Sequence, residues 1–348
     1  MHNKPFQWAI IGAGPAGIAA VGKLLDAGID PKSILWVDPQ FNAGDLGSLW
    51  NNVSSNTTVK LFKEFFLASP AFMYEHAPMD FELNHLPMKS TCRLGLVASP
   101  LQWVTQQLCQ KIVAKKEMIQ SLTLTNRLWH LQGESGAYHA KNTVLAMGAT
   151  PSALPFDNHK KVPFEIAIDI DRLTPVINKK ITYAVFGSSH SAMIIIKHLV
   201  DLGVKKIINF YRSPCRYAVD LGDSILFDNT GLKGETAQWT RNNIDGELPK
   251  NLVRYLATDK HLELYLPECE KVIYAVGFKP RETLSIKGYD ALDYNPHLGI
   301  IAPGLFGLGI AYPELKPDKF GFIEQQVGMW KFMLYLKKIL PIWLQYGA

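Results

Sequence analysis

The chain has 348 residues, 47% of them hydrophobic and 19% charged, which is the composition of an ordinary soluble globular protein. Its length predicts about two domains, each large enough to bury its own core. The net charge of +5 is mild for this size, and the lack of lysine or arginine runs argues against nucleic acid as a partner.

The first predicted elements are a strand, a tight turn and a helix. Residues 8–28 read WAIIGAGPAGIAAVGKLLDAG, in which an apolar run ends in the pattern G-x-G-x-x-G and passes into a helix-like pattern. Gly12 permits the sharp turn, Gly14 lets a pyrophosphate approach the backbone, and Gly17 allows close packing of the helix on the strand. The first N–H groups of the helix would then face the phosphates.

A second strand is predicted over residues 34–37, and it is closed by Asp38. A carboxylate at this place can accept hydrogen bonds from both hydroxyls of an unphosphorylated ribose, as in FAD or NAD. Glycine turns between a strand and a helix also occur for packing alone. Because strand, turn, helix and acid agree here, the pattern predicts a dinucleotide site.

A meander of strands is predicted over residues 120–146, where apolar and polar residues alternate on either side of a Gly-Glu-Ser-Gly turn. Residues 144–151 read VLAMGATP and form a β-rich strand that ends in Gly148 and a proline. At such an end the chain must leave its sheet.

The first unit is repeated 175 residues later, where residues 184–193 read AVFGSSHSAM. Under this shift Gly12 falls on Gly187, and the third glycine falls on Ala192, which is the permitted variant at that position. Ser189 replaces the middle glycine and is still small enough for a close approach of the backbone to a ligand. The repeat therefore predicts a second nucleotide fold.

The second unit differs from the first at the end of its second strand. Where the first unit has Asp38, the second has Ser213 beside Arg212. A carboxylate would repel a 2′-phosphate, whereas a guanidinium can pair with one through two hydrogen bonds. The two residues therefore favour NADPH, and the alternative is an arginine that is merely solvated at a strand end.

The remaining segments predict a return to the first domain. Residues 220–243 are polar and poorly periodic, which is typical of a long loop over a site. Residues 272–280 read VIYAVGFKP and form a second exit strand, with Gly277 near its end. After Gly304 comes the stretch LFGLGIAYPE, and a helix-like run begins at Phe322. The first domain is thus expected to be split around the second.

The cysteines and the terminal segments limit which cellular environments the sequence fits. Cys92, Cys109, Cys215 and Cys269 are scattered, include no C-x-x-C pair and form no metal-ligand pattern with the histidines. This usage fits a reducing cytoplasm and lacks the dithiol of a thioredoxin or glutathione reductase. No secretory signal and no apolar stretch long enough to span a membrane is expected. The tail from Lys331 is interpreted as a helix packed on its own domain, with peripheral contact to a membrane surface as the alternative.

The arrangement resembles the flavin-dependent oxidoreductases with two dinucleotide-binding domains, the superfamily of thioredoxin reductase and the flavin-containing monooxygenases. The resemblance covers nearly the whole chain and rests on GAGPAG, VLAMGATP, GSSHSA, FYRS, VIYAVGFKP and LFGLG, in the family's order. It implies an α/β fold of two Rossmann-like, three-layer domains, with FAD in the first and NADPH in the second, which is inserted into the first. The implied boundaries are 1–155 and 283–348 for the FAD-binding domain and 156–282 for the NAD(P)H-binding domain.

Within the superfamily, the nearest match is to the flavin-containing monooxygenases. Residues 46–60 read LGSLWNNVSSNTTVK, which looks like their GGxW turn and V-x-[ST]-N-[ST]-[ST] stretch. The asparagine of that stretch lies beside the reactive edge of the flavin, and Asn56 is the matching residue. An amide there can hydrogen-bond an oxygen species on the flavin without protonating it, which would be a catalytic role. The alternative is that the loop merely forms a capped turn.

Two departures from the family patterns bear on the reaction. The Phe-Gly fingerprint of the monooxygenases between the two domains does not occur, which leaves oxygen transfer open. Residues 308–311 read LGIA and lack the aspartate of thioredoxin-reductase relatives, as the monooxygenases also do.

The resemblance implies an FAD-dependent, NADPH-using oxidoreductase, and a monooxygenase acting on a small molecule is the favoured interpretation. A flavoprotein reductase that passes electrons to a carrier protein or a quinone is one alternative, and a non-enzymatic FAD-binding regulatory protein is the other. The predicted cofactor-binding residues, of which Asn56 is also the catalytic one, are Gly12, Gly14, Pro15, Ala16, Gly17, Asp38, Pro39, Gly47, Trp50, Asn56, Gly148, Gly187, Ser188, Ser189, His190, Ser191, Arg212, Ser213, Gly277 and Gly309.

Overall fold

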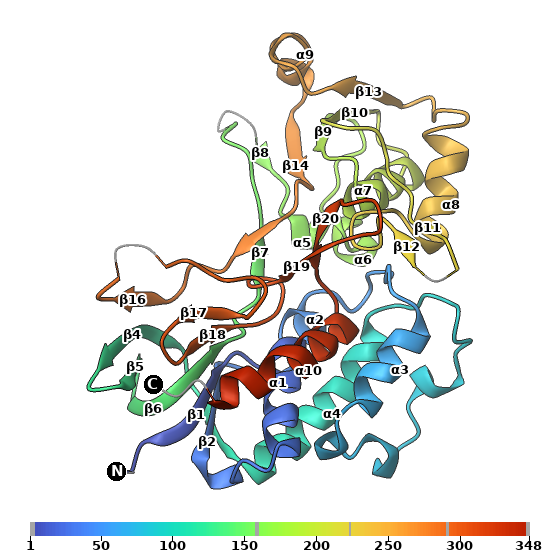
Figure 1. Cartoon of the computed structure of the whole chain (residues 1–348). Helices are drawn as coiled ribbons and strands as arrows, with labels where there is room; N and C mark the ends of the chain where they lie inside the picture. The colour runs from blue at the N-terminus through green and yellow to red at the C-terminus, as the bar shows by residue number, and fades with distance from the viewer. Residues whose placement is uncertain (1–3, 157–159, 223, 290–291, 346–348) are drawn as a thin grey trace.

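The computed structural model describes residues 4–156, 160–222, 224–289 and 292–345. They form two lobes, each built around a sheet, and the chain passes from the first lobe to the second and back (Figure 1). The expected α/β fold class, with one Rossmann-like unit inserted into another, is confirmed.

The first lobe contains a sheet of nine strands among the described residues. These strands are β1 (Phe6–Ile11), β2 (Ile34–Asp38), β3 (Val113–Lys116), β4 (Ile119–Thr125), β5 (Leu128–Gly133), β6 (Ala137–Leu145), β16 (Ser285–Lys287), β17 (Ile300–Ala302) and β18 (Leu305–Gly307). β1, β2 and β3 run parallel, and β4, β5 and β6 form the expected antiparallel meander. The sheet forks on β6, because its first half pairs with β5 and its second half pairs with both β1 and β18.

Helices cover one face of this sheet. They are α1 (Pro15–Asp26), α2 (Asp45–Ser48), α3 (Val59–Leu67), α4 (Gly95–Lys111) and α10 (Met329–Gln345). Side chains of β1 alternate between the two faces, so that Trp8 lies in the core under the helices and Ala9 lies in the core of the opposite face. Trp8 stacks on Phe306, and Phe306 stacks on Trp343 of α10. The C-terminal helix is therefore part of the first lobe's core.

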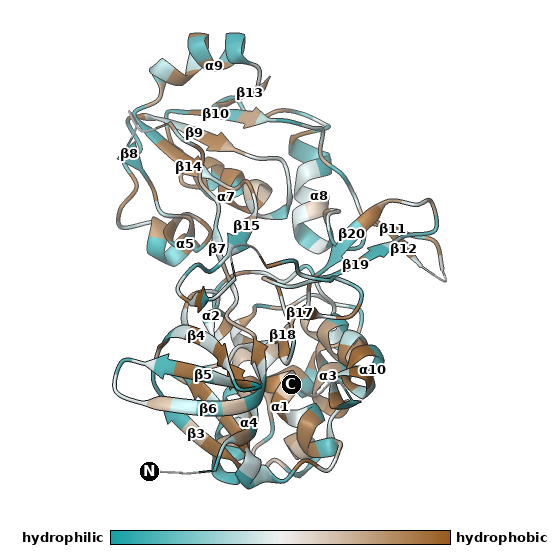
Figure 2. Ribbon diagram, turned by 60° about the vertical axis from the view of Figure 1, so that its left-hand side comes forward, coloured by the Kyte–Doolittle hydropathy of each residue, from teal (hydrophilic) through white to brown (hydrophobic). Residues whose placement is uncertain are grey.

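The second lobe has a sheet of five parallel strands in the order β13-β10-β9-β14-β8 within the described segments. Its strands are β8 (Lys160–Lys161), β9 (Thr182–Phe186), β10 (Lys206–Tyr211), β13 (Leu252–Leu256) and β14 (Lys271–Tyr274), and its helices are α5 (Phe164–Ala167), α6 (Ile170–Leu173), α7 (His190–Asp201), α8 (Gly234–Asn243) and α9 (Asp259–Tyr265). α5, α6, α7 and α8 contribute to the core on one face, and α9 packs on the other. The strands at the centre of this lobe are hydrophobic (Figure 2).

Short paired strands occupy the region between the lobes. The two exits from the sheets, β7 (Ala149–Pro151) and β15 (Phe278–Pro280), pair with each other antiparallel. β11 (Val219–Asp220) and β12 (Ile225–Leu226) form one hairpin, and β19 (Glu314–Pro317) and β20 (Ile323–Gln326) form another. Both hairpins lie at the junction of the lobes (Figure 2).

Two of the expected elements were wrong. The helix predicted from Phe322 begins only at Met329, because residues 323–326 form β20 and Gly328 adopts a φ of +138°. The loop predicted over residues 220–243 ends in the helix α8. Few residues of α8 are buried, so its sequence shows little apolar periodicity.

We expect Gly17→Ala to lower the free energy of unfolding of the flavin-free protein by about 3 kcal/mol through overpacking. A Cβ at Gly17 would lie 1.9 Å from the carbonyl oxygen of Gly12, whereas a Cβ at Gly14 has no neighbour nearer than the Cα of Gly44 at 3.9 Å. Gly14→Ala is therefore the matched control and should cost at most about 1 kcal/mol, the usual effect of alanine at a helix N-cap. Denaturant unfolding of both variants measures the difference, and equal losses would contradict the close contact.

Candidate functional site

The first glycine turn connects β1 to α1 as its spacing predicts. Gly12 has a φ of +108°, its amide donates to the carbonyl of Val37 at 2.9 Å, and a Cβ there would meet the carbonyl oxygen of Ala146 at 2.3 Å. Only glycine fits such a position. Gly14, by contrast, leaves space above the backbone at the N-terminus of α1. A phosphate can approach at that point.

Asp38 is fixed at the end of β2 by three backbone amides. Its Oδ2 accepts from the amide of Ala13 at 2.8 Å, and its Oδ1 accepts from the amides of Gln40 and Phe41 at 2.8 and 2.7 Å. The carboxylate therefore ties the end of β2 to the glycine turn. Oδ1 already accepts two hydrogen bonds and Oδ2 one, so Oδ2 can accept one more, from a ribose hydroxyl.

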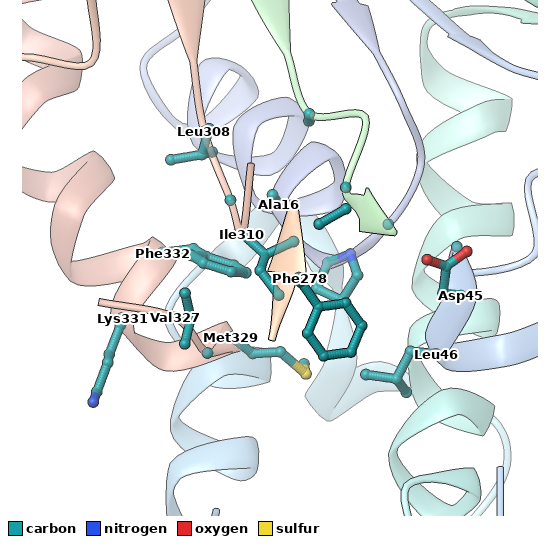
Figure 3. A pocket seen from close by; sticks show the side chains of 18 of the residues that line it. Ala16, Asp45, Leu46, Phe278, Leu308, Ile310, Val327, Met329, Lys331 and Phe332 are labelled. Atoms are coloured by element: carbon teal, nitrogen blue, oxygen red, sulfur yellow. The ribbon is translucent and has the colours of Figure 1, made fainter. Parts of the chain in front are cut away.

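A cavity of about 360 Å³ runs from the glycine turn towards the inserted lobe. Figure 3 shows apolar side chains around its centre, among them Phe278, Val327 and Met329, while the side chain of Lys331 points away from that centre. Nine of the predicted residues line this cavity: Gly12, Gly14, Pro15, Ala16, Asp38, Trp50, Asn56, Gly148 and Gly309. The lining does not include the others, which are Gly17, Pro39, Gly47, Gly187, Ser188, Ser189, His190, Ser191, Arg212, Ser213 and Gly277.

Two glycines leave bare backbone along the cavity, which allows a ligand to approach the main chain closely. Gly148 and Gly309 have φ angles of +73° and +98°, and they expose bare backbone along the lining. A Cβ at Gly309 would lie 2.7 Å from the Cβ of Ala16. Gly47 has a packing role instead, because a Cβ there would meet the carbonyl oxygen of Asn42 at 2.0 Å.

The loop that carries Asn56 is held in place by its neighbours. The amide of Ser55 donates to the carbonyl of Cys92 at 2.9 Å, and the amide of Cys92 donates to Oγ of Ser55 at 3.2 Å. Oδ1 of Asn56 accepts from the hydroxyl of Thr57 at 3.3 Å. Within the described part of the chain, Nδ2 of Asn56 has no acceptor. The loop is thus a secured turn that also presents an amide donor at the cavity.

The second glycine turn has the same construction as the first. Gly187 has a φ of +126°, its amide donates to the carbonyl of Phe210 at 2.9 Å, and a Cβ there would meet the carbonyl oxygen of Ala275 at 2.3 Å. Nδ2 of the buried Asn209 donates to the carbonyl of Gly187 at 2.8 Å and braces the turn. The turn leads through Ser189 into α7.

The expected match between Asp38 and Ser213 was wrong by two residues. Ile11 of β1 lies opposite Val37, and the equivalent Phe186 of β9 lies opposite Phe210, so the structural counterpart of Asp38 is Tyr211. The shift arises because a turn over residues 31–33 lengthens the first connection, while the second passes directly into β10. Arg212 follows the strand end immediately, and it is exposed.

His190 begins α7, and its imidazole is buried rather than solvent-exposed. Among the described residues, neither ring nitrogen makes a hydrogen bond of regular geometry, although the backbone of Ser54 lies beside the ring. Burial lowers the pKa of His190 to about 4, and the positive charge of Lys233 also lowers it. His190 is therefore neutral at pH 7 and brings α7 against the loop of the first lobe.

Sequence reasoning missed an ion-pair cluster between the lobes. The ammonium groups of Lys233 and Lys331 both contact the carboxylate of Asp228, and all three residues line the cavity. Burial lowers the pKa of Lys331, and Asp228 only partly offsets this. Burial raises the pKa of Asp228, but the two lysines lower it overall. No periodic pattern marks the residues around Asp228 and Lys233, so the sequence offered only the charges of the three side chains as a sign of this cluster.

A second missed pair is Arg281 with Asp45, whose Nη2 and Oδ2 lie 2.8 Å apart at the cavity wall. Arg281 directly follows the exit strand VIYAVGFKP, which is the one signal that could have found it. The pair ties the second connection between the lobes to α2.

All four cysteines are free thiols. Burial raises the pKa of Cys109 to about 11 and that of Cys269 to about 12, and it also raises the pKa of Cys92 and Cys215. These thiols are therefore protonated at neutral pH and poor nucleophiles. Across the described segments, no cluster of three or more histidine, cysteine or acidic residues could hold a metal ion, and no helix is long and apolar enough to cross a membrane.

The chain is similar to proteins of known fold and activity. It is 29% identical to monooxygenase AgnR1 of Paecilomyces divaricatus over 96% of this chain and 97% of that protein. Its fold is similar to that of a flavin-containing monooxygenase from Stenotrophomonas maltophilia, with a TM-score of 0.68 and 12% identity over 99% of both chains. It is also similar to the bacillithiol disulfide reductase from Staphylococcus aureus, with a TM-score of 0.63 and 13% identity over 98% and 99% of the chains. No protein-family model matches the chain.

The buried His190 should make the stability of the protein depend on pH. Between about pH 6.5 and 4 the unfolded histidine is protonated while His190 in the folded protein is still neutral. The free energy of unfolding therefore falls as the pH is lowered through this window. We expect this loss to be smaller in His190→Gln than in the wild type by up to about 3 kcal/mol, measured by denaturant unfolding. Replacing the exposed His297 by Gln is the control and should leave the wild-type profile; identical profiles for His190→Gln and the wild type would refute the assignment.

Proposed function

We infer that the protein is an FAD-dependent oxidoreductase that uses NADPH and acts as a monooxygenase on a small molecule. This inference rests on two glycine turns of the same construction, one opening onto the cavity and one at the junction of the lobes. The relative AgnR1 is a monooxygenase and is similar over nearly the whole chain. FAD, when bound, accepts a hydride from NADPH and passes electrons on to oxygen or another acceptor.

The residues of the first lobe would bind and orient FAD. The turn at Gly14 and the N-terminus of α1 receive the pyrophosphate, and Asp38 receives the adenosine ribose. Apolar side chains from α3 and α10, such as Leu61 and Met329, exclude water from the far end of the cavity. The amide of Asn56 offers a hydrogen-bond donor there without offering an acidic proton.

The residues of the second lobe would hold NADPH. The turn over residues 187–191 receives the pyrophosphate, and Arg212 pairs with the 2′-phosphate. The ring of His190, at the second turn, lies beside the backbone of Ser54, two residues from Asn56 on the cavity lining, so the second turn adjoins the cavity. This arrangement supports delivery of the nicotinamide to the flavin at the junction of the lobes.

The cysteines favour a monooxygenase over a reductase of disulfides. The four thiols are scattered and held protonated by burial, so the chain has no dithiol to relay electrons. A cytoplasmic location accords with four free cysteines in one chain. The domain boundaries 1–155, 156–282 and 283–348 remain part of this proposal.

We expect NADPH to reduce the bound flavin rapidly under anaerobic conditions. The loss of the flavin absorbance, recorded in a stopped-flow instrument, measures the rate of this reduction. Arg212→Ala should weaken the binding of NADPH by about ten- to a hundredfold and leave the binding of NADH unchanged, because only NADPH carries the 2′-phosphate. Arg127→Ala removes an exposed arginine at the β4–β5 turn and is the matched control. A flavin that NADPH does not reduce would support the regulatory alternative, and equal use of NADH and NADPH by the wild type would contradict the role of Arg212.

Asn56→Ala should increase the fraction of consumed NADPH that appears as hydrogen peroxide, because the amide donor at the cavity is lost. The rate of flavin reduction should change less than about twofold, since hydride transfer precedes the reaction with oxygen. Asn51→Ala, in the same loop but outside the cavity lining, should behave as the wild type. Peroxide assays together with NADPH consumption measure the ratio. An unchanged ratio in Asn56→Ala would favour the reductase alternative.

A further inference from the structure

A second cavity lies between the two hairpins at the junction of the lobes and has a volume of about 250 Å³. Its outer walls come from β11–β12 and β19–β20, which lie next to each other (Figure 2). Leu221, Ile225 and Phe320 give these walls apolar surface, and the β19–β20 side also carries charged residues, namely Lys316, Asp318 and Lys319. No residue predicted for FAD or NADPH binding lines this cavity.

The two cavities share one wall. Asp228 and Asn229 line both of them, so a single segment separates the cavity between the hairpins from the cavity that would hold the flavin. From the first lobe, Nζ of Lys331 contacts Oδ2 of Asp228 and donates to Oδ1 of Asn229 at 2.5 Å. The carboxylate of Glu324 accepts from the backbone amides of Asn229 and Thr230, each at 3.2 Å, and from their side chains at 3.3 and 2.7 Å. Every one of these bonds uses a side chain, so the wall can open without breaking a strand pair.

The wall presents different charged groups to the two cavities. Lys233 and Lys331 line only the cavity of the first lobe, whereas Glu324 lines only the cavity between the hairpins. Asp228 and Asn229 add further hydrogen-bond acceptors to the hairpin side. A molecule that enters between Leu221, Ile225 and Phe320 therefore meets the carboxylate of Asp228 and the amide oxygen of Asn229 at the inner end. The remaining lone pairs of these oxygens favour a leading hydroxyl or amine group.

We propose that the cavity between the hairpins is the entry site of the organic substrate, and that the wall formed by Asp228, Asn229, Lys331 and Glu324 is the gate to the flavin. The ligand class is a small molecule with an apolar skeleton and a hydrogen-bond donor. The inference rests on the proposed function, because it takes the first cavity as the flavin site. The dinucleotide approaches from the α7 turn, so substrate and NADPH use different routes.

Entry is measured with flavoprotein that has been reduced by light in the presence of EDTA and then mixed with 1,4-benzoquinone without oxygen. In this reaction two electrons and two protons convert each quinone to hydroquinone while the flavin is reoxidised. Ile225→Trp narrows the entry site, and Val219→Trp adds the same bulk to an exposed position of the same hairpin that does not line it. We expect reoxidation about tenfold slower in Ile225→Trp and unchanged in Val219→Trp. Equal rates in both variants and the wild type would overturn the proposal.

The gate is tested by Lys331→Met, which keeps the apolar stem and removes the contacts to Asp228 and Asn229. Reoxidation should become several-fold faster, and the double variant with Ile225→Trp should lose this gain. A gain that persists in the double variant would mean that Lys331 acts on the flavin itself, and it would overturn the gate.

The ligand class is tested with p-cresol and its methyl ether, which lacks the donor. p-Cresol should slow the quinone reaction of the wild type several-fold more than the ether, and Ile225→Trp should abolish the difference; equal inhibition by both would overturn the donor preference. Because the flavin is reduced by light, these tests still run if NADPH fails as a reductant, so a failure of the entry site and a failure of the proposed function are distinguishable.

Discussion

Both lobes depend on one backbone contact, the hydrogen bond from a glycine amide at the end of the first strand to a carbonyl of the neighbouring strand. Gly12 donates to Val37 in the first lobe, and Gly187 donates to Phe210 in the second. In each case the glycine has a positive φ, and a carbonyl from a third strand segment lies where a side chain would be. The contact sets the direction of the following helix, and thereby leaves the helix N-terminus open for a phosphate.

The sequence predicted the parts of the fold that obey local rules. The glycine spacing, the apolar strands and the exit prolines each have a physical cause within a few residues, and the structure contains both units and the meander. The match of Asp38 with Ser213 was wrong because it assumed one constant shift of 175 residues, whereas a turn over residues 31–33 lengthens the first connection only. The strand β20 fell within the predicted helix because it is only four residues long and is stabilised by pairing with β19 rather than by its own pattern.

The candidate site was predictable where backbone geometry defines it and not where charges from distant segments meet. Gly14, Asp38 and Asn56 lie on the cavity, as their motifs indicate. Asp228, Lys233 and Lys331 meet across the lobes. Asp228 and Lys331 are 103 positions apart in the sequence, so no local pattern predicts their contact. Such groups become visible only when the two lobes are placed together, and here they form the boundary between the two cavities.

The pairing of β7 with β15 bears on how the chain acquired its architecture. Because Pro151 and Phe278 are opposite each other in the β7–β15 pair, the chain leaves the first lobe and returns to it at neighbouring points. A segment with adjacent ends can be gained or exchanged as a cassette in one recombination event, without rethreading the host sheet. The same adjacency makes the lobe a transplantable module, one that could be swapped for the equivalent lobe of a relative by joining two short stretches of chain.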